Sequence, residues 1–206
     1  LSFQLDTGEW LFKDITFNLS TRLTGLVGRN GAGKSLLLSL LIGQKQPTTG
    51  SISRQGSIGF YSQLPSKLLD TNITIADFLG LTEKLEALSA IEQGSCELQH
   101  FNIVGDDWDL EARTQQLLGT IKITSGLNTL CCSLSGGQLA LLQLHQLFVS
   151  NNDILILDEP SNHLDNDGRN WLLEQCQLFE GKTLVVSHDR SLLRQMDGIY
   201  HLNSLG

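Results

Sequence analysis

The sequence is poor in cations, in closely spaced cysteines and in long apolar runs. Lysine and arginine together number 14 against 22 aspartates and glutamates, and the net charge is −8, so no overall positive field would hold nucleic acid. The four cysteines show no C-x-x-C spacing, which argues against a zinc site and indicates reduced thiols of a cytoplasmic protein. The most apolar windows, Leu36–Ile42 and Leu139–Val149, are too short or too interrupted to span a bilayer. No signal peptide is recognisable, although the chain opens at Leu1 and not at a methionine, which leaves room for a preceding segment.

An eight-residue stretch between an apolar run and a helical run follows the pattern G-x-x-x-x-G-K-[ST]. This pattern, in this context, predicts a phosphate-binding loop. Gly28, Gly31 and Gly33 would let the backbone take conformations that other residues disfavour, so that successive N–H groups face an anion, and the helix that opens at Gly33 would add its positive end. Lys34 would contact the β- and γ-phosphates, and the Ser35 hydroxyl would ligate Mg²⁺. A glycine-rich turn before a helix is the alternative. The predicted nucleotide-binding residues are Gly28, Arg29, Asn30, Gly31, Ala32, Gly33, Lys34 and Ser35.

Two adjacent carboxylates, Asp158 and Glu159, follow the all-apolar run 154–157. Such a run fits a strand buried on both faces of a parallel sheet, and ligands of these sheets bind at the carboxyl ends of the strands. Asp158 is the candidate Mg²⁺ ligand, and Glu159 would polarise the attacking water. Gln63 and His188 also follow predicted strands; Gln63 would touch the metal and the water, and His188 would sense the γ-phosphate. Plain strand ends, helix capping and a structural histidine are the alternatives.

The order of predicted elements indicates an α/β sheet that begins with an antiparallel β-subdomain and contains an inserted helical lobe. We expect one domain, 1–206, with a nucleotide-binding core at 1–63 and 150–206 and a helical subdomain at 64–149. The predicted strands are 1–5, 10–19, 51–54, 57–62, 154–157, 183–186 and 198–202. The predicted helices are 34–42, 75–81, 84–92, 110–118, 134–149, 164–179 and 190–195.

A second helix start that could bind an anion comes about a hundred residues after the first, at Leu134, Ser135, Gly136, Gly137 and Gln138. Ser135 can cap the following helix, and the two glycines expose its first N–H groups. With these motifs in this order, the sequence resembles the ATP-binding cassette (ABC) superfamily over essentially its whole length. The resemblance implies a P-loop ATPase fold of the ABC type that uses ATP and Mg²⁺. It also implies that the signature, Leu134 to Gln138, acts in trans on ATP held by a second cassette, from the same parent chain or from a second copy.

Within that superfamily, Ser161–Asp165 looks like the ABC-F branch, whose members carry two cassettes on one soluble chain and act on the ribosome. The stretches 105–110 and 187–193 are also similar to that branch. The resemblance implies the first cassette of a longer protein that acts in translation or in antibiotic resistance. A transporter's motor cassette and a cassette that binds ATP without turnover are the alternatives. The chain departs from the branch in two places. Leu141 stands where members commonly carry arginine, and the aromatic that stacks on adenine is not obvious near Thr7, with Trp10 a weak candidate.

Overall fold

The computed structural model describes residues 1–62 and 72–203, which fall into two compact units. Unit 1 joins the N-terminal part of the chain, up to residue 63, to the part from Gln143 onward. Unit 2 is the stretch between them, Leu64–Leu142. Helix α7 (Gly136–Val149) contributes residues to both units. In the described residues, no helix is long and apolar enough to cross a membrane.

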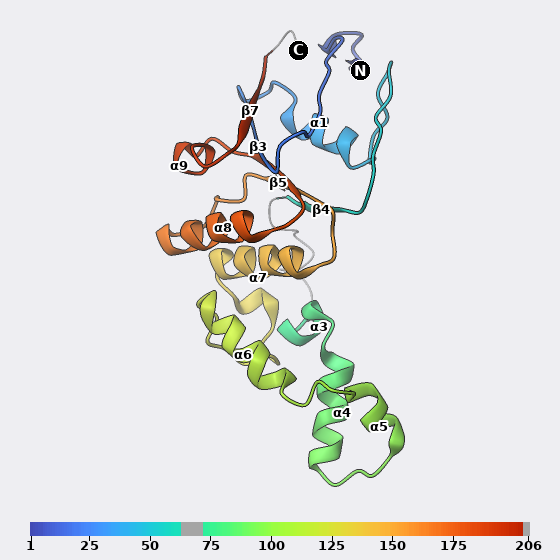
Figure 1. Cartoon of the computed structure of the whole chain (residues 1–206), viewed down its shortest axis with the longest axis vertical. Coiled ribbons are helices and arrows are strands. Elements are labelled where there is room, and N and C mark those ends of the chain that lie inside the picture. The colour runs from blue at the N-terminus through green and yellow to red at the C-terminus, as the bar shows by residue number, and fades with distance from the viewer. Residues whose placement is uncertain (63–71, 204–206) are drawn as a thin grey trace. The chain divides into compact units, whose positions relative to one another are not determined.

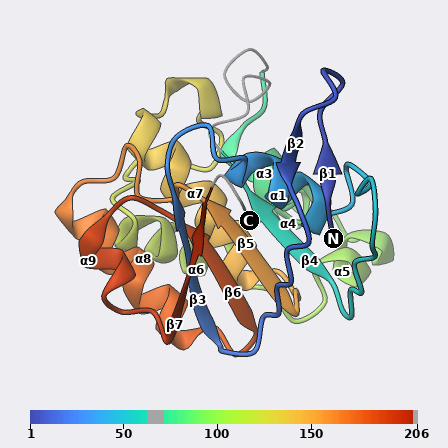
Figure 2. The same ribbon diagram turned by 90° about the horizontal axis from the view of Figure 1, so that it is seen from above.

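Unit 1 is built on a five-stranded sheet in which every neighbouring pair is parallel (Figure 2). The order across the sheet is β4-β5-β6-β3-β7. Each strand is short and mostly apolar, as expected where helices and loops cover both faces. The strands are β3 (Leu23–Gly28), β4 (Ile58–Tyr61), β5 (Ile154–Asp158), β6 (Lys182–Val186) and β7 (Gly198–Leu202).

The core of unit 1 lies between the sheet and helix α1 (Lys34–Leu41). This helix has apolar residues almost all round, and Leu37, Leu38 and Leu40 are at most 2% exposed. They pack with residues of β3, β5, β6 and β7 in one hydrophobic cluster. The buried helix and the parallel sheet confirm the α/β fold that the sequence predicts.

Two further helices complete the described part of unit 1, α8 (Asn166–Leu178) and α9 (Arg190–Leu193). Each begins after an aspartate whose carboxylate accepts a backbone hydrogen bond, from Gly168 N to Asp165 and from Ser191 N to Asp189, both at 2.8 Å. The Asp165 cap begins α8 at Asn166, two residues later than predicted, whereas α9 begins at Arg190 as predicted.

The antiparallel part of unit 1 is smaller than the sequence predicts. Strands β1 (Phe3–Gln4) and β2 (Trp10–Phe12) pair with each other, but the strands predicted over 13–19 and 51–54 are absent from the described residues. The alternation of Ile15, Phe17 and Leu19 does place these side chains against the core cluster. Alternation fixes which side chains are buried, whereas a strand also needs a partner for its backbone.

Unit 2 consists mainly of helices, and α4 and α5 lie side by side in it (Figure 1). Helix α3 begins with a capping box in which Thr74 accepts a bond from Asp77 N and Asp77 accepts one from Thr74 N. Helix α5 was not predicted, because its seven residues are too few to establish a helical apolar period. The helices are α3 (Ile75–Leu79), α4 (Thr82–Glu92), α5 (Leu98–Val104) and α6 (Leu110–Thr120), with a 3₁₀ turn at Cys131–Ser133.

Candidate nucleotide-binding site

The parallel sheet of unit 1 brings the predicted catalytic segments together at one edge. Strands β5 and β6 pair so that Asp158 lies beside Val186, and β6 pairs with β3 so that Val186 lies beside Leu26. The loops that leave the carboxyl ends of β3, β5 and β6 therefore start as neighbours. They carry Lys34, Glu159 and His188.

The phosphate-binding loop owes its shape to two glycines with left-handed backbones. Gly31 and Gly33 have φ angles of 81° and 89°, a region that side chains disfavour. Gly28 is different, because it lies in β3 and has no positive φ; a Cβ there would lie 2.7 Å from the carbonyl oxygen of Leu202. The prediction that Gly28 supplies backbone freedom is thus wrong, and close strand packing requires it instead. Gly33 caps α1, as predicted.

Lys34 bridges its own loop and His188, which lies in the loop after β6. Its Nζ donates to the carbonyl oxygens of Gly28 at 2.8 Å and Arg29 at 3.3 Å, and lies 3.2 Å from Nε2 of His188. The carbonyl contacts fold the ammonium group over the mouth of the loop. A phosphate bound by the loop would therefore meet a full positive charge.

Asp158 ends β5 beside the loop and is half-buried. Burial raises the pKa of this carboxyl above its ordinary value, against the opposing effects of the Lys34 charge and a hydrogen bond with Ser35. Asp158 and Ser35 thus place a carboxylate and a hydroxyl side by side. Both are oxygen ligands of the kind that Mg²⁺ prefers.

Glu159 and His188 form a contact pair. The Glu159 backbone has a φ of 49°, and its N–H donates to Val186 O at 2.8 Å. Its carboxylate accepts a long bond from the His188 N–H at 3.4 Å, and its Oε1 lies 3.5 Å from His188 Nε2. A neutral Nε2 can accept from Lys34 or donate to Glu159 but cannot do both. The tautomer of the His188 ring therefore decides which of the two contacts is a hydrogen bond.

The side chains of Lys34, Asp158, Glu159 and His188 line a pocket of about 870 Å³. Within the predicted loop, Arg29 is exposed, whereas Gly28 and Ala32 are buried away from the lining. Sequence reasoning gave no nucleotide-site role to Leu36, Ser62 or Asn162, of which Asn162 follows the two carboxylates and could have been found from that position. Gln63 lies outside the described residues. The lining comprises Asn30, Gly31, Gly33, Lys34, Ser35, Leu36, Ser62, Asp158, Glu159, Asn162 and His188.

The signature residues lie in unit 2, at the start of α7. Ser135 Oγ accepts from Gln138 N at 3.2 Å, and Gln138 Oε1 accepts from Ser135 N at 3.0 Å, a reciprocal capping box. Gln138 also donates to Lys122 O at 2.9 Å. Leu134 is buried, while Ser135 and Gly136 are exposed. The helix start is thus rigidly held with its small residues accessible, as the anion-binding prediction requires.

A profile of the family described as "ABC transporter" matches residues 12–162 of this chain. The match runs from β2 to Asn162 and includes both the phosphate-binding loop and the signature. The chain belongs to this family. It is an ATP-binding cassette domain, as the motif order indicates.

Curated relatives of this cassette agree with the ABC-F resemblance. The ATP-binding protein Uup of Haemophilus influenzae is 34% identical over an alignment of 192 residues, which covers 83% of this chain and 29% of that protein. ABC transporter F family member 5 of Arabidopsis thaliana is 29% identical over 92% of this chain and 31% of its own length. The energy-dependent translational throttle protein EttA of Mycobacterium tuberculosis is 29% identical over 82% of this chain and 33% of its own length. The cassette therefore spans about a third or less of the length of these relatives.

Solved structures confirm the fold of the cassette. An ATP binding subunit of an ABC transporter aligns with a TM-score of 0.72 at 22% identity, over 99% of this chain and 84% of that one. A putative metal-chelate type ABC transporter in an inward-facing conformation aligns with a TM-score of 0.71 at 23% identity, over 99% and 78%.

The two departures from the ABC-F pattern also have places in the structure. Leu141 is 6% exposed in α7, so an apolar side chain occupies a buried position there. Trp10 is 45% exposed on β2. The two residues that follow it, Leu11 and Phe12, approach the position where a Cβ of Gly33 would lie. The hairpin that carries Trp10 is thereby anchored against the phosphate-binding loop.

Proposed function

We propose that this cassette binds Mg-ATP in the pocket of unit 1 and hydrolyses it when a second cassette closes over the nucleotide. The observation that carries the proposal is the convergence of Lys34, Asp158, Glu159 and His188 around one pocket beside the phosphate-binding loop. These residues come from three separate segments, and only a site for a phosphate with its metal and water uses all of them.

Ser35 and Asp158 are the proposed Mg²⁺ ligands, with Gln63 as a third. Their hydroxyl, carboxylate and amide oxygens fit the ion. Among the described residues, no group of three or more histidines, cysteines, aspartates or glutamates could hold a metal. A sparse protein ligand set suits an ion whose remaining ligands are phosphate and water oxygens. When bound, Mg²⁺ neutralises part of the phosphate charge.

Glu159 is the proposed residue that orients and polarises the attacking water. Its left-handed backbone turns the chain sharply after Asp158, so that the two adjacent carboxylates serve different purposes. His188 is proposed to contact the γ-phosphate, because its Nε2 already lies 3.2 Å from Lys34 Nζ. When the γ-phosphate is lost, Glu159 would remain as the partner of the His188 ring.

The proposed partner is a second cassette, because this chain carries one phosphate-binding loop and one signature. The exposed start of α7 at Ser135 and Gly136 would cap the γ-phosphate held by the other cassette. We propose that this chain is the first cassette of a longer cytoplasmic ABC-F protein. The relative named as a translational throttle supports ribosome-linked action, in which closure driven by ATP acts on translation.

The decisive experiment separates binding from hydrolysis in the assembled protein. Lys34→Ala should weaken Mg-ATP binding about tenfold or more, since a charge-assisted phosphate contact contributes about 1.5 to 3 kcal/mol. Glu159→Gln should keep ATP affinity and abolish steady-state turnover. Glu174→Gln, an exposed glutamate on α8, is the matched control and should change neither. Equal ATP affinity of wild type and Lys34→Ala, or undiminished turnover of Glu159→Gln, would contradict the proposal.

Pairing is tested by light scattering of the Glu159→Gln form, with the second cassette added. ATP should promote association and ADP should not, because only ATP offers the γ-phosphate to the signature. Fast turnover by a strictly monomeric chain, insensitive to Ser135→Ala, would show that one cassette holds the complete site.

A further inference from the structure

Unit 2 carries an exposed apolar patch, formed by Leu98, Phe101 and Trp108. Leu98 and Phe101 are three residues apart on α5 and so face the same side of the helix. They are 79% and 37% exposed, and Trp108, in the turn between α5 and α6, is 54% exposed. The ring centroids of Phe101 and Trp108 lie 6.0 Å apart. Isolated exposed apolar residues are ordinary, but three in contiguity with two large rings indicate a contact surface.

The turn that presents Trp108 is held in place by the residue before it. The Asp107 carboxylate accepts hydrogen bonds from Lys84 of α4 and from Arg113 of α6, the latter at 2.9 Å. The Asp107 N–H donates to Val104 O at 3.1 Å. The indole therefore extends from a turn that is tied to three helices. Such preorganisation lowers the entropy that a partner must overcome on binding.

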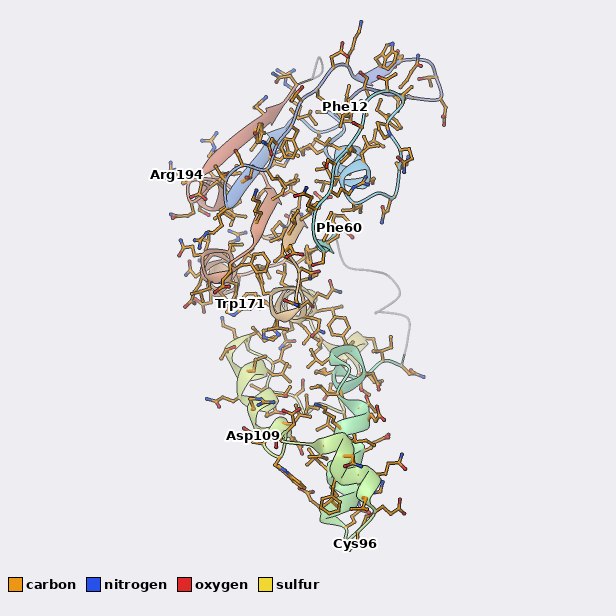
Figure 3. All side chains as sticks on the ribbon, turned by 45° about the vertical axis from the view of Figure 1, so that its right-hand side comes forward. Phe12, Phe60, Cys96, Asp109, Trp171 and Arg194 are labelled. Atoms are coloured by element: carbon orange, nitrogen blue, oxygen red, sulfur yellow. The ribbon has the colours of Figure 1, made fainter. Side chains whose placement is uncertain are left out.

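The patch has an acidic border. Glu97 directly precedes Leu98, and Asp106 and Asp109 flank Trp108; all three are exposed. Asp109, at the start of α6 (Figure 3), is 3.6 Å from Arg113. In residues 72–142, nine acidic side chains accompany three cationic ones, Lys84, Arg113 and Lys122, which is a net charge of −6. Two of those three cations are engaged with Asp107.

We propose that this patch docks a basic amphipathic protein segment, with apolar side chains on Leu98, Phe101 and Trp108 and with lysines or arginines opposite the acidic border. An exposed ring pair beside a leucine fits the apolar face of a helix, which presents side chains at intervals of three and four residues. The net charge favours a cationic partner and accelerates its approach. A nucleic acid, which could stack on the same rings, would meet repulsion from the three acidic residues at the border.

The test uses the whole 206-residue chain and a fluorescent 16-residue peptide of leucine and lysine, with leucine at helical spacing. Fluorescence anisotropy should show saturable binding that weakens as salt rises. Trp108→Ala and Phe101→Ser should each weaken it about tenfold or more. Leu98→Ser should also weaken it, whereas its matched control Leu178→Ser, 66% exposed on α8 in unit 1, should not. Circular dichroism establishes that each variant is folded, and Trp108→Phe should retain most of the binding if Trp108→Ala unfolds unit 2.

Two further ligands and one charge variant separate the contribution of charge to peptide binding from that of apolar contact. A peptide with glutamate in place of lysine should bind at least tenfold more weakly, and Glu97→Gln with Asp106→Asn should flatten the salt dependence of the lysine peptide. A 20-nucleotide polyuridine should not compete. The proposal is overturned if the lysine peptide does not bind, if Leu98→Ser and Leu178→Ser behave alike, or if polyuridine binds in a way that depends on Trp108.

Discussion

Both units of this cassette bury apolar side chains, such as Leu184 in unit 1 and Leu118 and Ile123 in unit 2, each at 0% exposure, but the two units differ in how their elements are joined. In unit 1, the central strands β5 and β6 are buried on both faces, and Leu155, Leu157 and Leu184 are fully inaccessible to solvent. In unit 2, polar side chains cap and join short helices: the Thr74–Asp77 box caps α3, and Asp107 accepts hydrogen bonds from α4 and α6. Unit 1 brings Lys34, Asp158 and His188 together around one pocket at the edge of the sheet. Unit 2 exposes both charge and apolar surface.

This difference between the two units predicts where in the chain a substitution lowers stability most. A close-packed sheet transmits any change of volume to its neighbours, whereas a polar tie at a helix end acts locally. We therefore expect the cost of substitution to fall from the core of unit 1 to the surface ties of unit 2.

The largest effect is expected at Leu184, which is fully buried in β6 against α1. Leu184→Ala should lower the free energy of unfolding by about 3 kcal/mol, through lost burial and the cavity left behind. Urea unfolding followed by circular dichroism measures this. Ile199→Ala, on β7 at 54% exposure, is the matched control and should cost under about 0.5 kcal/mol. Similar losses at both positions would show that burial in the sheet does not set the cost of a substitution.

The next effect contrasts two glycines with positive φ, one in each unit. A Cβ on Gly33 would lie 2.6 Å from Cζ of Phe12, whereas a Cβ on Gly80, which ends α3, would meet nothing within 4 Å. Both substitutions to alanine incur a backbone cost of about 1 kcal/mol, and Gly33→Ala adds an overpacking cost of about 1 to 3 kcal/mol. Thermal unfolding of the two variants gives the difference. If Gly80→Ala is the more harmful change, unit 2 is the less tolerant unit.

A smaller effect is expected at the capping box of α3. Thr74→Ala removes the acceptor for Asp77 N and should cost about 1 kcal/mol. Thr74→Ser, which keeps the hydroxyl, should restore most of that loss. Hydrogen exchange of the α3 amides is the appropriate measurement, because the effect should stay within unit 2. Faster exchange throughout the parallel sheet would show that the cap supports unit 1 as well.

The smallest effect concerns Asp107 and depends on pH. Hydrogen bonds from Lys84 and then Arg113 lower the pKa of Asp107 below its ordinary value of 3.8. Its stabilising contribution is therefore complete above that value and is lost as the pH falls toward the lowered pKa. Asp107→Asn should reduce the melting temperature slightly at pH 7 and remove part of the acid sensitivity below pH 4. Asp106→Asn is the neighbouring control, and an identical response would show that the Asp107 bonds contribute nothing.

Sequence reasoning could anticipate that Asp158 and His188 lie near each other, because their positions follow from chain order in a parallel sheet. Asp158 and His188 each follow a run of apolar residues, and the carboxyl ends of parallel strands share one edge. It misjudged the antiparallel part, since the alternation of Ile15 and Phe17 says nothing about whether a partner strand lies within reach. It missed α5, because a helix of seven residues is too short for an apolar period to be established.

By itself, the sequence determined the motifs, their order and the class of fold, because local patterns of glycine, charge and apolar residues depend only on neighbours along the chain. The tertiary structure decided which atoms meet. It set His188 between Lys34 and Glu159, assigned Gly28 to strand packing and brought Phe101 beside Trp108. The contacts of His188 and Gly28 join residues that are far apart in sequence, and the Phe101–Trp108 contact depends on how a turn folds back on its helix. Their geometry follows from strand register and helix packing, which no local pattern encodes.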